Sequence, residues 1–217
     1  MARHTSSPEL LAPANGPADP ELLSLPRPPR LERTVSLMLM AVTAFLALAM
    51  TVALAGDVRF AFASAVPDDV GEMMHFVPDD GMQNRFVRGT GMLSAASAIR
   101  YDRPMERDSF RLAPIAGNDN IWVEMRIPEG INPAQFVPPA TFVGRLLPMH
   151  SAAFRYRGLG RSVHEVTGAA VPENAWVLVD GATPASSRWT VALAALFAIF
   201  AAYNLVTIAR IVRPVRK

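Results

Sequence analysis

The chain contains no cysteine in its 217 residues. Disulfides, thiol catalysis and cysteine-ligated metal sites are therefore excluded, and a domain exported from the cell must be held together by its core. Lysine is nearly as scarce, since Lys217 is the single one, whereas arginine and alanine are abundant. This bias is typical of a GC-rich bacterial genome, so we expect a bacterial host.

Signatures of catalysis and of metal binding are also missing. Neither HExxH nor GxSxG occurs, so zinc or serine chemistry would have to recruit His75, His150 or His164, for example His164 with Ser162 and Asp180. A repeated Val-Pro-Asp-Asp produces one dense acidic cluster, but its spacing matches no calcium loop, and solvated loop carboxylates are the commoner meaning. Its members are Asp68, Asp69, Glu72, His75, Asp79 and Asp80. We predict no catalytic residue, no cofactor and no metal.

Two stretches, residues 34–56 and 189–209, lack charge altogether. At about 1.5 Å of rise per residue, each is long enough to cross the roughly 30 Å hydrocarbon layer of a bilayer as a helix. We predict two transmembrane helices. Because neither contains an ionisable side chain, an ion path or proton relay through them is not expected.

Basic residues near the membrane ends predict the orientation, because arginine and lysine are retained in the cytoplasm. Seven stand at the two inner ends: Arg27, Arg30, Arg33, Arg210, Arg213, Arg216 and Lys217. Both termini should be cytoplasmic, and residues 57–188 should be periplasmic or external to a bacterial inner membrane. As an alternative, cleavage after Ala53-Leu54-Ala55 would leave a tail-anchored domain, although the preceding leader is longer than a usual signal peptide.

Small side chains recur every four residues in both predicted spans. Such stripes let helix backbones approach closely in lipid, so we predict that they are the faces through which the spans pack, within one chain or with a partner. The stripe residues are Thr43, Ala47, Thr51 and Ala55 in the first span and Thr190, Ala194, Ala198 and Ala202 in the second. Asn204 is the one strongly polar side chain within the spans.

The rest of the chain divides by composition. Residues 1–33 form a proline-rich tail predicted to be disordered, residues 57–84 a connector with a short helix after Pro67, residues 85–188 a β domain, and residues 210–217 a basic tail. Alternating apolar residues from Ile121 to Ile127 predict a strand with one buried face. Similar short strands are predicted at 85–93, 109–115, 141–149 and 175–180, and a helix at 160–167.

Five strands with a helix before the last predict a small, mainly β domain of the size of an oligonucleotide/oligosaccharide-binding barrel, with a generic barrel or sandwich as the alternative. Within it, alternating charges predict a salt-bridged, solvated surface, with a polyanion site as the less favoured reading. They comprise Arg100, Arg103, Arg107 and Arg111 together with Asp102, Glu106 and Asp108.

The region from 57 to 187 is mildly acidic, which argues against nucleic acid as a ligand. By elimination, we expect a non-enzymatic inner-membrane protein that contacts membrane lipid and whose external domain binds another membrane or periplasmic protein, as a scaffold or assembly module. The alternatives are a membrane-anchored hydrolase using His150 or His164, and a lipid- or glycan-binding module with exposed Trp122 or Tyr156 lining a groove.

Overall fold

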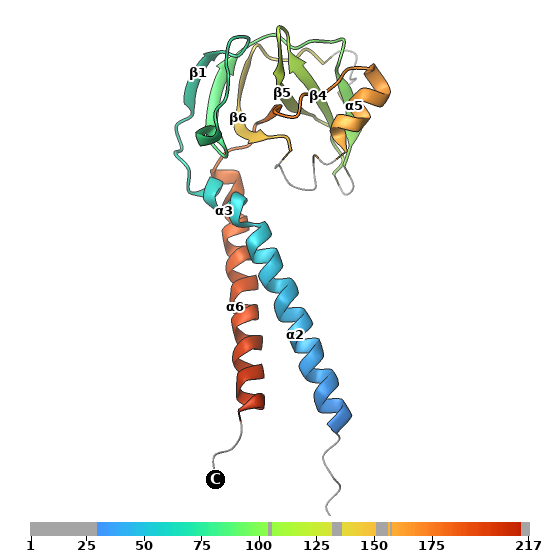
Figure 1. Ribbon diagram of the computed structural model, residues 1–217. Helices are drawn as coiled ribbons and strands as arrows, with labels where there is room; N and C mark the ends of the chain where they lie inside the picture. The colour runs from blue at the N-terminus through green and yellow to red at the C-terminus, as the bar shows by residue number, and fades with distance from the viewer. Residues whose placement is uncertain (1–29, 104–105, 132–135, 151–155, 157, 214–217) are drawn as a thin grey trace, which may run out of the picture.

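Two long helices carry a sheet domain at one end (Figure 1). The computed structural model describes residues 30–103, 106–131, 136–150, 156 and 158–213. Helix α2 covers Arg30–Ala53, helix α6 covers Arg188–Val212, and the short helix α3, Ala55–Ala61, continues α2 towards the sheet. Residues 1–29 of the predicted proline-rich tail and the last four residues lie outside the described residues, whereas residues 30–33, predicted as part of that tail, form the first turn of α2.

The sheet has seven strands in the order β1-β2-β6-β7-β5-β4-β3. Since β1 and β3 pair with one neighbour each, the sheet is open, and the predicted barrel is wrong. The pairing is mixed, because β1 runs parallel to β2 and β7 runs parallel to β5. The strands are β1 (Asp68–Glu72), β2 (Phe86–Thr90), β3 (Ile99–Asp102), β4 (Ser109–Ile115), β5 (Asn118–Ile127), β6 (Thr141–Pro148) and β7 (Trp176–Asp180).

All five predicted strands are confirmed as β2, β4, β5, β6 and β7, and the predicted helix is α5, Leu159–Thr167, which precedes the last strand. The two strands that were not predicted, β1 and β3, are the two edges of the sheet. After Pro67 the chain forms β1 rather than the expected helical turn. Strand β1 is exposed or half-buried throughout and carries no apolar alternation, whereas β3 alternates buried Ile99 and half-buried Tyr101 with exposed Arg100 and Asp102 over only four residues.

Both faces of the sheet are covered. One cluster, built around Val123, Phe142 and Leu178, lies under the loops that contain Met73 and Phe136, and the other lies between the sheet and α5, around Trp122 and Val163. Strand β5 is therefore buried on both faces rather than on one, which corrects the prediction from its alternation. Trp122 is 1% exposed and cannot line a surface groove.

Helices α2 and α6 pack against each other along their length, and both are long and apolar enough to span a membrane. Along this contact, buried and half-buried residues recur in steps of three and four, which is the spacing of a left-handed helix pair. In α2 and the turn after it these are Leu37, Met40, Ala44, Ala47, Thr51 and Leu54, and in α6 they are Thr190, Ala194, Phe197, Ala201, Asn204, Ile208 and Ile211. We call this surface the helix seam.

Candidate functional site

The sheet domain is joined to the helix pair by a polar junction around Arg145 of β6. The Nη1 of Arg145 lies 2.5 Å from the Asp57 carboxylate of α3, while its Nε and Nη2 donate to Oδ1 of Asn84. Its guanidinium carbon also lies 4.7 Å from the centre of the Phe60 ring, and Phe60 is fully buried against Phe86. One arginine thus connects α3, the turn before β2 and the centre of the sheet. With that side chain only 13% exposed, the ion pair is screened less than one in open water.

A second attachment is covalent. Strand β7 ends at Asp180, and α6 begins at Arg188, so a short turn joins a central strand to the second long helix. Thr183 and Ser186 exchange hydrogen bonds between backbone N–H and hydroxyl, each 3.2 Å long, in the reciprocal pattern of a capping box. The two attachments fix how the sheet sits on the helices.

A hollow of about 490 Å³ lies where these parts meet. Its wall includes Arg145 and Tyr156 from the sheet domain and Trp189 and Thr190 from the start of α6. Arg145 is already engaged by Asp57 and Asn84, so the hollow offers a ligand an aromatic surface and few free charges.

A buried ion pair lies on the other half of the sheet. Arg103, just after β3, donates to the Glu124 carboxylate of β5, whose side chain is 2% exposed. The Arg103 guanidinium stacks 3.7 Å above the centre of the Phe110 ring, and Phe110 in turn stacks on Tyr101. Burial, together with the charge of Glu124, raises the pKa of Tyr101 far above its ordinary value, so this phenol stays neutral. One Glu124 oxygen, Oε2, and the Nε of Arg103 make no hydrogen bond within the described chain.

The residues singled out as hydrolase candidates are not gathered into one site. His75, His150 and His164 are all exposed, and none hydrogen-bonds a serine or a carboxylate among the described residues. Asp180 instead accepts the N–H of Val143 at 3.0 Å. The acidic cluster is divided between β1 and the turn at Asp80, and no group of three possible metal ligands occurs in the described part of the chain.

The predicted packing residues fall on different surfaces. Ala47, Thr190 and Ala194 are buried in the helix seam, and Thr43 and Thr51 are half-buried. Ala198 and Ala202 are exposed on α6, and Ala55 is exposed on α3. The threonine hydroxyls of Thr43, Thr51 and Thr190 each donate to a carbonyl of their own helix, so they do not bond across the seam.

Comparison of the chain with protein-family models, with curated proteins and with solved structures finds no match.

Sequence reasoning missed the junction, because Asp57, Asn84 and Arg145 lie far apart along the chain and belong to no motif. The sequence contains one indication of the buried Arg103–Glu124 pair. Between Ile121 and Met125, all residues except Glu124 are apolar. A lone carboxylate in such a strand needs a cationic partner.

Proposed function

We propose that this protein is a two-pass bacterial inner-membrane protein whose sheet domain is a docking module for another membrane or periplasmic protein. The observation that carries the proposal is the combination of an open sheet, whose two edge strands have no outer partner among the described residues, and a two-point attachment to a packed helix pair. An unpaired edge offers backbone donors and acceptors to a partner strand. The attachment would hold that edge at a fixed height above the membrane.

The two helix ends opposite the sheet are linked by a hydrogen bond, which supports a hairpin that crosses the bilayer twice. Arg33, near the start of α2, donates from Nη2 to the backbone oxygen of Ile211, near the end of α6, at 2.7 Å. Of the basic residues that predict the cytoplasmic side, Arg33, Arg210 and Arg213 in the described chain therefore lie at a single end of the helix pair. Membrane lipid would cover the exposed apolar side chains of both helices, such as Phe45 and Ile199.

The test is purification of the tagged full chain from detergent-solubilised membranes, with identification of the proteins that accompany it. The control is a variant that keeps α2 and α6 but replaces residues 64–182 with an unrelated domain. We expect a partner that co-purifies with the full chain and not with the control. An identical set of proteins from both would contradict a docking role for the sheet domain.

One observation favours a second candidate, lipid or glycan binding. Trp189, which is 64% exposed, lines the hollow at the junction, where the outer membrane surface would lie, whereas Tyr156 on the opposite wall is 4% exposed and, contrary to expectation, is largely buried. Enrichment of one lipid class with the wild-type protein, but not with a Trp189→Ala variant, would support it. Hydrolysis by His150 or His164 has no comparable geometric support.

A further inference from the structure

Two arginines lie directly opposite each other at the β3 edge of the sheet. In the pairing of β3 with β4, Arg100 faces Arg111, so both side chains leave the same face of the sheet. Like charges in directly opposed positions destabilise a strand pair. Such an arrangement therefore requires an explanation.

The carboxylates near these arginines do not neutralise them. Asp108 is engaged by Arg126 and by the N–H of Glu129, and Glu106 lies beside Arg103. In the described chain, no carboxylate lies within ion-pair distance of Arg100 or Arg111, including Asp102 two residues along β3. Arg100 donates only to the hydroxyl of Ser109, at 2.7 Å. Within the predicted salt-bridged surface, the guanidinium groups of Arg100 and Arg111 thus have no ion-pair partner in the described chain and are available to a ligand.

The arginine pair lies in a hollow with an apolar wall. About 430 Å³ of space is bounded by both arginines and by Ala95, Ala98, Ile127 and Phe136. A ligand that fills it must combine an anionic group with an apolar one. Guanidinium groups match the planar geometry of a carboxylate, with which they form short, charge-assisted hydrogen bonds.

The outer side of β3 is the edge of the sheet, and no strand of the described chain pairs with it. An added strand would place every second side chain on the face of Arg100 and Arg111. A residue opposite Arg100 could then reach both arginines, and a residue two positions away, opposite Ala98, would fill the hollow.

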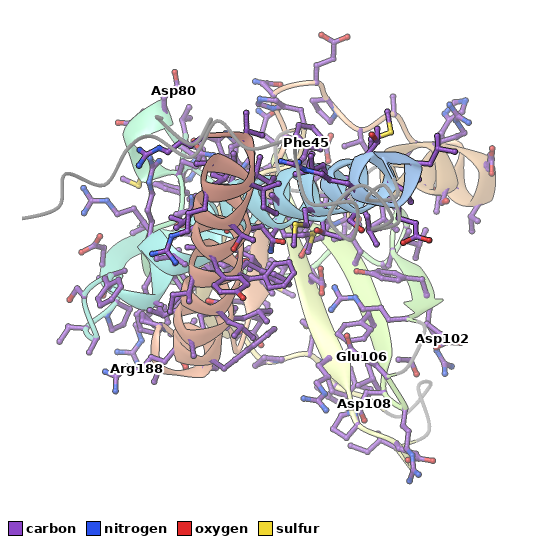
Figure 2. The ribbon with its side chains drawn as sticks, turned by 90° about the horizontal axis from the view of Figure 1, so that it is seen from below. Phe45, Asp80, Asp102, Glu106, Asp108 and Arg188 are labelled. Atoms are coloured by element: carbon purple, nitrogen blue, oxygen red, sulfur yellow. The ribbon has the colours of Figure 1, made fainter. Side chains whose placement is uncertain are left out.

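The opposite edge differs in charge and in shape. Strand β1 carries Asp68, Asp69 and Glu72, and its register is interrupted between Asp69 and Gly71, where Gly71 has a φ of 68°. A bulged, acidic edge disfavours an added acidic strand. Figure 2 places Asp80, near the β1 side, and Asp102, at the β3 edge, on opposite sides of the domain. The two edges are thus separate surfaces.

We propose that the β3 edge binds an extended segment of the partner protein that carries a carboxylate opposite Arg100 and an apolar side chain two residues away, opposite Ala98. This inference rests on the docking function proposed above and specifies its site. Backbone pairing along β3 supplies attachment, while the arginine pair and the hollow select a carboxylate and an apolar side chain separated by one residue.

The test is site-specific photo-cross-linking of the full chain in living cells. A benzoylphenylalanine replaces Asp102 on β3, Asp69 on β1 or Glu165 on α5, one at a time. We expect an adduct from position 102. Arg111→Gln and Arg100→Gln should each reduce it about tenfold, since each removes a charge-assisted contact. Arg88→Gln is the matched control, because Arg88 is an exposed strand arginine outside the hollow.

Mass spectrometry of the adduct should locate a carboxylate with an apolar residue two positions away. An adduct from position 102 that survives both substitutions in the arginine pair would overturn the inference. Adducts from position 69 or 165 alone would also overturn it while leaving the docking function in place. No adduct from any position would count against both proposals. Thermal unfolding of each glutamine variant checks that it is folded, and a variant that fails to fold is left out of the comparison.

Discussion

At the scale of single residues, the buried Arg103–Glu124 pair shows how two charges can be retained inside the domain. The attraction between them offsets the loss of hydration only while both are present, and the stacking of Arg103 on Phe110 adds to it. Removing one partner leaves the other charged and buried. Replacing both with apolar side chains removes the cost of lost hydration and the attraction between the charges together.

We therefore predict that Glu124→Leu lowers the free energy of unfolding by about 3–5 kcal/mol, and that adding Arg103→Met recovers much of that loss. Thermal or denaturant unfolding of the full chain in detergent measures both. Arg85→Met is the control, since its pairing with Asp68 is more than half exposed on both sides and should be worth at most about 1 kcal/mol. A double variant that is less stable than Glu124→Leu would contradict this account.

Asp180 predicts a pH dependence. Burial raises the pKa of its carboxyl group, although the N–H of Val143 donates to it and acts in the opposite direction. The folded state therefore binds the proton more readily than the unfolded state does. The carboxylate destabilises the fold above the folded pKa, and this penalty disappears as the pH falls below the unfolded pKa.

Asp180→Asn retains an acceptor for the Val143 N–H and removes the charge. We expect a higher melting temperature than wild type at about pH 7, and a gain that shrinks towards zero near pH 3. Melting temperatures measured across this range test the sign. A variant that is less stable at neutral pH would show that the charged form is the one that the fold favours.

At the scale of elements, the centre of the sheet depends on the close approach of β6 and β7. A Cβ atom added at Gly144 would lie 2.0 Å from the backbone oxygen of Val179, and backbone cannot move aside as a side chain can. Gly160 in α5 is the opposite case, because its nearest neighbour is a Val171 side-chain atom at an ordinary 3.7 Å.

Gly144→Ala should lower the free energy of unfolding by about 2–4 kcal/mol, as expected for a forced shift in a packed core. Gly160→Ala should raise it by about 0.5–1 kcal/mol, because alanine loses less conformational freedom in a helix. Unfolding of the two variants under the same conditions tests the pair. If both substitutions changed the free energy of unfolding equally, the close approach of β6 and β7 would not be the reason why position 144 requires glycine.

The helix pair can be tested with neighbouring alanines. Ala201 is 3% exposed in the helix seam, whereas Ala202 is exposed. Ala201→Leu adds bulk between the helices and should weaken their contact, while Ala202→Leu, with the same gain in hydrophobicity, should not. Cysteines introduced at Ala47 and Ala194, both in the seam, report the contact through cross-linking. If Ala202→Leu is the more disruptive change, the stripe with four-residue spacing is the packing face instead.

The sequence predicted the elements whose pattern is local. The two apolar helices, the interior strands and α5 each carry an apolar run or alternation that reflects burial along their own length. Strand β1 carries none, because its side chains are exposed or half-buried on both faces. Strand β3 does alternate Ile99 and Tyr101 with Arg100 and Asp102, but over four residues only, which is too short a run for a period to be recognised. The order of the strands, the Arg145 junction and the opposed Arg100 and Arg111 depend on which segments meet in space. A single sequence does not contain that information in its local spacing.

At the scale of the whole molecule, the structure places the sheet and the basic helix ends at opposite ends of the helix pair (Figure 1). A helix of 24 residues, such as α2, is about 36 Å long, which is enough to cross the hydrocarbon layer. If the basic ends are retained in the cytoplasm, the whole sheet domain must be on the other side. The absence of cysteine makes this arrangement directly testable, because each introduced cysteine is then unique.

We predict that a membrane-impermeant maleimide added to intact spheroplasts labels Ala96→Cys, in the loop before β3, but not Arg213→Cys at the end of α6. Both positions are exposed in the structure, so accessibility differs only through the membrane. Permeabilisation should allow Arg213→Cys to react.

A tag at the N-terminus should remain attached and protected from external protease, because α2 packs along α6 and is expected to stay part of the mature protein. Labelling of Arg213→Cys in intact spheroplasts would overturn the orientation, and loss of the tag by cleavage after Ala55 would establish the tail-anchored alternative.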